Sequence, residues 1–210
     1  MRFDLLIRNA QIVTGSGVSL GSIGVIGEKI AVIEPELPGD AAEVVDATGL
    51  HVFPGLIDTH VHFNDPGRAD WEGAATGSAA LAAGGGTTFF DMPLNSSPPV
   101  LDAASFDAKV AALTGSSFTD FALWGGLTPL NLDQMGELAE RGVVGFKAFM
   151  SDSGISDFPR ADDFTLHHGM FQAAQLGLPV AVHAENHELT AGKAAWMKKT
   201  IPFPVGAMEW

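Results

Sequence analysis

The chain has 210 residues, 46% hydrophobic and 17% charged, a composition typical of a globular protein large enough to bury a substantial core. Its 25 acidic and 11 basic residues give a formal net charge of −14. That charge argues against nucleic acid or an anionic membrane as partner, because both require clustered Lys and Arg side chains. The chain has no cysteine, which excludes disulfides and thiolate ligands, so a metal ion would need nitrogen and oxygen donors.

The amino-terminal segment MRFDLLIRNA carries Asp4 and Arg8 within a short apolar run, which is unlike a signal peptide. No stretch of about 18 apolar residues follows, so we expect no transmembrane helix and a cytoplasmic location. Residues 1–52 mix alternating and continuous apolar patterns between glycine turns and show no helical period. These patterns predict an N-terminal β-rich domain over residues 1–52, built as a small β-sandwich or β-layer.

From residue 53 onward, five strand candidates alternate with helix candidates, which predicts a second, α/β domain over residues 53–210. Several of the helix candidates have an acidic residue near the start and a glycine just past the end, as helix caps require. The strand candidates are continuously apolar, which indicates a parallel sheet that is buried on both faces.

Polar residues stand at the carboxyl ends of the predicted strands, where both a β/α-barrel and a doubly wound sheet place their ligands. The pattern therefore leaves these two topologies open. The polar residues are His60, His62, Asp91, Lys147 and His183.

The first two of these residues have the spacing of metal ligands. In a strand, residues i and i+2 point to the same side with Cα atoms roughly 6.5–7 Å apart, so His60 and His62 can reach one divalent ion. An isolated His-x-His is also compatible with an ordinary strand, but His183 at the end of a later strand favours a metal site. Asp58, two residues before His60, faces the same side and is placed to orient that ring.

Lys147 is an unexpected residue within the apolar stretch VVGFKAFM, where we expect its side chain to point into the interior. A buried, unpaired ammonium is costly, and burial lowers the pKa of a lysine. Two interpretations stay open. The lysine either reaches solvent from the strand end, or it is a neutral amine that adds carbon dioxide to form a carbamate, an oxygen ligand able to bridge two metal ions.

Four motifs occur in the order GLIDTHVHFNDPG, DMPLN, GFKAFMSDSG and HAEN. They resemble those of the cyclic amidohydrolases of the dihydroorotase, hydantoinase and allantoinase group. The resemblance covers residues 1 to about 190. It implies an α/β fold made of the first five or so β/α units of a metal-dependent amidohydrolase TIM barrel, preceded by a small N-terminal β-sandwich segment.

The same resemblance implies a two-metal site in which His60 and His62 bind one ion, carboxylated Lys147 bridges, and His183 binds the second ion. Zinc is the preferred metal, with cobalt, manganese or iron as alternatives, and CO2 carboxylates the lysine. Two such ions lower the pKa of a bridging water and polarise the carbonyl of a cyclic amide. In this family a sixth-strand histidine completes the site and an eighth-strand aspartate is the general base. We expect the base beyond residue 210, and no catalytic residue within this chain.

Departures from the family patterns bear on which ring is opened. Dihydroorotases carry an arginine two residues after His-x-His, but this chain has Asn64 there, which favours a neutral substrate. Hydantoinases and dihydropyrimidinases carry a tyrosine five residues after the lysine, but Asp152 stands there and the chain has no tyrosine. The motifs resemble most those of allantoinases. This implies ring opening of allantoin to allantoate in purine catabolism, with hydantoinase, dihydropyrimidinase or dihydroorotase activity as the alternatives.

Allantoin is neutral and carries a ureido arm that is rich in donors and acceptors, so polar loop residues are candidate contacts. Each of them is equally suited to capping a turn or helix. The candidates for substrate binding are Asn64, Asn95, Ser96, Asp152 and Ser153.

A complete barrel has eight β/α units and about 250 residues, so we expect this chain to be truncated at its carboxyl end. Its last ten residues, 201–210, resemble no barrel element. A hypothesis of another class follows, in which the chain is a non-catalytic half-barrel whose exposed strand edge favours self-association. For the complete protein we expect a small neutral cyclic ureide as substrate and a homo-oligomeric assembly.

Overall fold

The computed structural model describes residues 2–200, and the expectation that residues 201–210 form no barrel element lies outside them. The chain divides into two compact units, one ending at Gly55 and the other beginning at Leu56. The domain boundary predicted between residues 52 and 53 falls near this division and stays a prediction.

The first unit is a single five-stranded sheet of order β3-β2-β1-β4, with β5 also pairing with β1. Its strands are β1 (Phe3–Thr14), β2 (Gly17–Ile26), β3 (Lys29–Glu34), β4 (Ala41–Asp46) and β5 (His51–Val52). Strands β1, β2 and β3 are antiparallel neighbours, whereas β4 and β5 run parallel to β1. Within residues 2–55 the strands form one layer, so the β-layer form of the sequence prediction describes this unit.

A glycine turn joins β2 to β3, as the sequence predicted. Gly27 has φ +60°, a left-handed conformation that glycine adopts without steric cost, and its N–H donates to the Asp4 carboxylate over 2.6 Å. Below this turn, Ile12, Ile23 and two alanines form a small apolar cluster. The turn hydrogen bond and this small apolar cluster therefore both stabilise the sheet.

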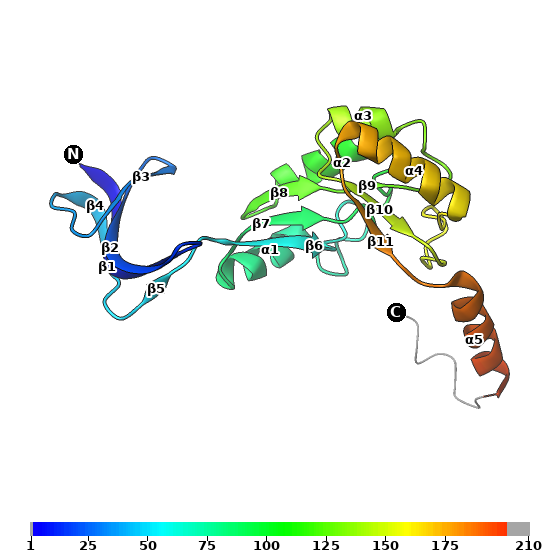
Figure 1. Ribbon diagram of the computed structural model, residues 1–210, viewed down its shortest axis with the longest axis horizontal. Helices are drawn as coiled ribbons and strands as arrows, with labels where there is room; N and C mark the ends of the chain where they lie inside the picture. Colours follow the sequence, from blue (N-terminus) through cyan, green and yellow to red (C-terminus); the bar gives the residue numbers. More distant parts are fainter. Residues whose placement is uncertain (1, 201–210) are drawn as a thin grey trace. The chain divides into compact units, whose positions relative to one another are not determined.

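The second unit contains five consecutive β/α units whose strands are all parallel (Figure 1). Its strands are β6 (Leu56–Val61), β7 (Gly86–Asp91), β8 (Asp120–Leu123), β9 (Gly125–Gly126), β10 (Phe146–Phe149) and β11 (Val180–His183). Its helices are α1 (Ala74–Ala83), α2 (Ala103–Thr114), α3 (Met135–Glu140), α4 (Asp163–Leu176) and α5 (His187–Thr200). The α/β fold with five β/α units is confirmed.

Strands β8 and β9 are two parts of one extended segment interrupted at Trp124. The Trp124 N–H donates to the Asp91 carbonyl over 3.0 Å, and the Gly125 N–H donates to the Gly145 carbonyl over 3.0 Å. The segment thus bonds to β7 on one side and leads toward β10 on the other. The strands consequently follow one another in chain order from β6 to β11, which is the order of a barrel wall.

Helix caps explain where α2 and α4 begin. The Asp102 carboxylate accepts from the Ser105 N–H over 2.8 Å, and the Asp162 carboxylate accepts from the Thr165 N–H over 2.8 Å. Gly177 ends α4 in the left-handed conformation, with φ 70°. The acidic starts and glycine ends predicted from the sequence are therefore confirmed for these helices. None of the helices within residues 2–200 is long and apolar enough to cross a membrane.

The main core lies between the strands and helices α1 to α4. Aromatic rings form its centre, with the Phe63 and Phe89 centroids 4.7 Å apart in an edge-to-face arrangement. Gly77 brings α1 against this cluster, because a Cβ there would meet the Phe63 ring at 2.4 Å. Phe63 directly follows His62, so this close approach also supports the loop that carries the histidines.

We expect Gly77→Ala to lower the free energy of unfolding by about 1–2 kcal/mol, because the buried Phe63 ring cannot move away from the added methyl group. Gly136→Ala in α3 is the matched control, since a Cβ there meets nothing within 4 Å. The control should raise the free energy of unfolding by a few tenths to about 1 kcal/mol. Chemical denaturation measures both changes, and a Gly77→Ala protein as stable as the control would contradict the packing argument.

Candidate functional site

His60 and His62 lie at the carboxyl end of β6, with ring centroids 5.4 Å apart. The Nδ1 atom of His62 is 2.6 Å from the Leu94 carbonyl oxygen. Because a carbonyl oxygen only accepts, Nδ1 carries the proton, and the Nε2 lone pair of the neutral ring stays available to a metal. Burial lowers the pKa of both histidines, which favours the neutral form that binds metal ions.

Lys147 lies within β10 and is only 4% exposed, which confirms that its side chain points into the interior. Its Nζ atom lies 5.1 Å from the centroid of the Phe149 ring. Within residues 2–200, no carboxylate forms an ion pair with this amine. Burial lowers the pKa of Lys147, and a neutral amine is the form that adds carbon dioxide. The surroundings of this lysine therefore suit carbamate formation.

His183 ends β11 directly opposite Phe149 of β10, and the two rings stack with centroids 4.9 Å apart. Its Nε2 atom lies 2.9 Å from the Glu185 carboxylate, which also accepts a hydrogen bond from the Ser151 hydroxyl. These contacts lower the pKa of Glu185, the Ser151 hydroxyl having the larger effect. A metal ion would therefore meet His183 through Nδ1 or would displace Glu185 from Nε2.

The four predicted metal ligands come from β6, β10 and β11 and influence one another. Beyond the effect of burial, the positive charges of Lys147 and His183 lower the pKa of His60 further, as expected of neighbouring groups. Within residues 2–200, no three His, Cys, Asp or Glu side chains lie close enough together to hold a metal ion. The metal-binding roles of His60, His62, Lys147 and His183 therefore stay predictions.

A buried ion pair lies beneath the histidine loop and was not predicted. Asp91 at the end of β7 and Lys109 of α2 are fully buried, with Nζ 3.2 Å from the carboxylate. Burial lowers the pKa of Lys109 and raises that of Asp91, while the attraction between the two opposes both shifts. The helical period places Lys109 on the buried face of α2 together with Phe106 and Leu113, but the sequence does not indicate that Asp91 is its partner.

The loop after β7 carries two of the predicted substrate contacts, Asn95 and Ser96, and a third, Asn64, lies in the loop after β6. The Asn95 amide donates to the Asn64 side-chain oxygen over 3.3 Å, and Asn64 adopts φ 68°, a left-handed conformation that asparagine tolerates. The Ser96 hydroxyl is buried, donates to the Pro93 carbonyl over 3.0 Å and accepts from Lys109 over 3.2 Å. The observed contacts of Ser96 are thus internal, and its predicted contact with substrate stays a prediction.

The remaining predicted residues are engaged in local turns. The Asp152 carboxylate accepts from the Gly154 N–H over 3.1 Å, and the Ser153 hydroxyl donates to the Phe158 carbonyl over 2.6 Å. Asp58 accepts from the His60 backbone N–H over 3.1 Å rather than from the ring. The substrate-binding roles of Asp152 and Ser153 and the ring-orienting role of Asp58 stay predictions.

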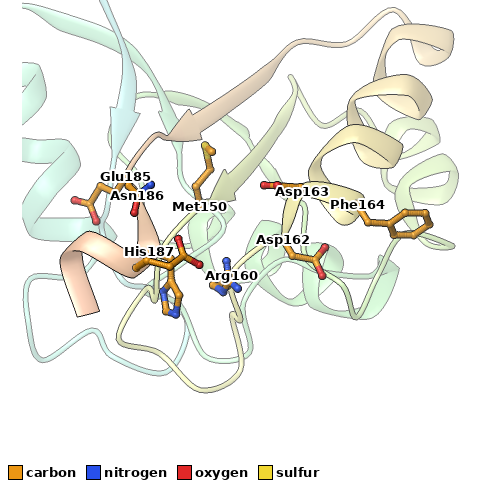
Figure 2. A pocket seen from close by; sticks show the side chains of 9 residues that line it. Met150, Arg160, Asp162, Asp163, Phe164, Glu185, Asn186 and His187 are labelled. Atoms are coloured by element: carbon orange, nitrogen blue, oxygen red, sulfur yellow. The ribbon is translucent and has the colours of Figure 1, made fainter. Parts of the chain in front are cut away.

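A cavity of about 380 Å³ opens beside His183, between the β10–α4 loop and the start of α5 (Figure 2). Arg160 stands between Glu185, Asn186 and His187 on one side and the first residues of α4 on the other. None of the predicted site residues lines it, but Glu185 does, and Glu185 bonds to His183. Sequence reasoning missed Glu185, although it belongs to the HAEN motif that carries His183.

The sequence pattern of the Amidohydrolase family matches residues 51–204, and the chain belongs to this family. The five parallel β/α units accordingly form part of an amidohydrolase TIM barrel, as the sequence predicted. Among solved structures, an L-hydantoinase (dihydropyrimidinase) from Arthrobacter aurescens is 31% identical with a TM-score of 0.87, over 95% of this chain and 44% of that one. A D-hydantoinase (dihydropyrimidinase) from a Thermus species is 29% identical with a TM-score of 0.78, over 93% of this chain and 43% of that one.

Curated relatives give higher identities, and they carry the name allantoinase. The chain is 58% identical to an allantoinase of Solibacter usitatus over 188 residues and 55% identical to one of Deinococcus radiodurans over 190 residues. Each match covers 90% of this chain, and the chain spans 41% and 42% of the length of these two relatives. The resemblance to allantoinases that the motifs carry is thereby confirmed.

We expect Lys109→Met to lower the free energy of unfolding by about 3–5 kcal/mol, because it leaves the buried Asp91 carboxylate without a counter-ion. The double variant Lys109→Met/Asp91→Asn removes that unpaired charge and should be the more stable of the two. Arg141→Met is the control, because its ion pairs with Asp107 and Glu137 are partly exposed and contribute less than about 1 kcal/mol. Equal losses in Lys109→Met and Arg141→Met on chemical denaturation would refute the argument.

Proposed function

We propose that this protein is an allantoinase that hydrolyses the ring amide of allantoin to give allantoate, with two divalent metal ions as cofactors. One observation carries the metal-dependent part of the proposal. His60, His62 and Lys147 meet at the carboxyl ends of the first and fourth strands of an amidohydrolase barrel, and the lysine is buried without a carboxylate partner among residues 2–200. These are three of the four ligands within this chain that the resemblance implies for a carbamate-bridged metal pair, and His183 of β11 is the fourth.

The reaction class follows from the chemistry of these donors. Water adds to the amide carbonyl carbon, the ring C–N bond breaks, and a proton from the water ends on the leaving nitrogen. Bound divalent ions supply a lowered water pKa and a polarised carbonyl. His60 and His62 donate neutral ring nitrogens, and carboxylated Lys147 donates oxygen. Zinc suits this set, with cobalt, manganese or iron as alternatives.

The choice of allantoin rests on two positions and on the similarity to allantoinases. Asn64 stands where a charged arginine would hold a carboxylate, and it is hydrogen-bonded to Asn95 over 3.3 Å. This amide pair offers donors and acceptors but no charge, which matches a neutral ureide. Asp152 is exposed and stands where hydantoinases carry a tyrosine. Hydrolysis of a hydantoin, a dihydropyrimidine or dihydroorotate is the alternative. A cytoplasmic location and a homo-oligomeric assembly stay predictions.

Metal content tests the donor set. We expect His60→Ala and Lys147→Ala to lower the zinc bound per chain to near background, because each removes a ligand. His167→Ala in α4 and Lys193→Ala in α5 are matched controls on exposed side chains and should leave metal content unchanged. Elemental analysis after dialysis measures the zinc content per chain. A wild-type zinc content in both His60→Ala and Lys147→Ala would refute the proposal.

Substrate preference tests the choice of allantoin as the substrate. In a complete protein that includes the expected general base, with zinc and bicarbonate supplied, we expect allantoin to be hydrolysed at a higher kcat/KM than a hydantoin or dihydroorotate, as measured by product analysis; activity of the 210-residue chain alone is not expected. Faster hydrolysis of either competitor would contradict the interpretation of Asn64 and Asp152. Normal metal content without turnover of any of these compounds would instead favour the hypothesis of a non-catalytic half-barrel.

A further inference from the structure

Lys109 has a set of contacts that its ion pair with Asp91 does not explain. Its Nζ atom also donates to the Met92 carbonyl over 2.7 Å and to the Ser96 hydroxyl over 3.2 Å. An ammonium has three donors, and here three acceptors surround it inside the core. One buried cation therefore holds the end of β7 and both ends of the loop 92–96.

The middle of that loop meets a predicted metal ligand. The Leu94 carbonyl lies 2.6 Å from Nδ1 of His62, between the two points where Lys109 holds the loop. Asp91 is a second link, because its carboxylate accepts from the N–H of Phe63, the residue after His62, over 3.3 Å. The ion pair is thus connected to His62 through the ring and through the backbone.

We propose that Lys109 is a positioning residue for His62: by holding the loop 92–96, it keeps the Leu94 carbonyl on Nδ1 and so leaves Nε2 unprotonated for the metal. Lys109 itself is fully buried. The inference rests on the proposed function, in which His62 is a ligand. Groups that hold the second nitrogen of a metal-binding histidine fix its tautomer and ring orientation.

Two side chains tie the loop to this arrangement from opposite sides. Ser96 accepts a hydrogen bond from Lys109 and donates one to the Pro93 carbonyl over 3.0 Å. Its hydroxyl therefore connects the Lys109 ammonium to the loop backbone. Arg68 donates to the Asn95 carbonyl over 3.0 Å from the loop that follows β6. The carbonyl that faces His62 therefore belongs to a segment fixed on both sides.

The test is the His62 tautomer in the metal-free protein, read from the 15N shifts of the ring nitrogens by NMR and assigned with a His62→Gln variant. In the wild type we expect the Nδ1–H tautomer alone. In Lys109→Met/Asp91→Asn, which leaves no unpaired buried charge, we expect the Nε2–H tautomer to appear. Zinc affinity should fall about 10–100-fold in the same variant. Arg141→Met is the control and should match the wild type in both readouts.

A folded double variant that keeps Nδ1–H as its only tautomer would overturn the inference, whatever its zinc affinity. A lysine that only stabilised the core would give that result together with a lower free energy of unfolding. If the double variant does not fold, Ser96→Ala takes its place, because it removes one hydroxyl and no charge, and the same criterion applies. A changed tautomer in a protein whose wild type binds no zinc would leave the positioning role supported and refute the proposed function.

Discussion

The ion pair between Asp91 and Lys109 is the interaction on which the candidate site depends. Two charges without solvent are stable together only if their remaining hydrogen-bonding groups are also satisfied. Here the further partners are the Met92 carbonyl, the Ser96 hydroxyl and the Phe63 N–H, all in segments that carry or face the histidines. These hydrogen bonds connect the pair to the histidine loops, although the Asp91 oxygen Oδ2 has only the 3.2 Å ion-pair contact with Lys109. A change in the pair is therefore expected to alter the loops.

The same low polarity that makes it unfavourable to bury the two charges of the pair also favours the uncharged forms of the neighbouring groups. Burial lowers the pKa of His60, His62 and Lys147, so each is biased toward its uncharged form. Neutral imidazoles bind metal ions and a neutral amine reacts with carbon dioxide. Lys109 and Lys147 are both buried, but only the first has a carboxylate partner among residues 2–200. This difference distinguishes Lys109 from Lys147, which the proposed function makes a metal ligand.

Much of this arrangement could be predicted from the sequence because it follows from periodicity. The two-residue period of a strand puts His60 and His62 at one strand end, and the apolar neighbours of Lys147 predict its burial. The ion pair could not be predicted, because Lys109 and Asp91 meet only when α2 packs on β7. Nor could the contacts of Ser96 with Lys109 and the Pro93 carbonyl be predicted. Serine and asparagine in loops form the same hydrogen bonds to the backbone whether or not a ligand is near.

Strands β6, β7 and β8 pair in chain order, and so do β9, β10 and β11, so after the first strand of each sheet a new strand finds its partner already present. During synthesis from the amino terminus, the wall of the barrel can therefore lengthen one unit at a time. Trp124, which follows β8, also contacts the first of these strands, because its indole N–H donates to the Thr59 carbonyl of β6 over 3.1 Å. The histidine pair at the end of β6 is synthesised before Lys147 of β10, so these predicted metal ligands can come together only after the fourth strand has left the ribosome.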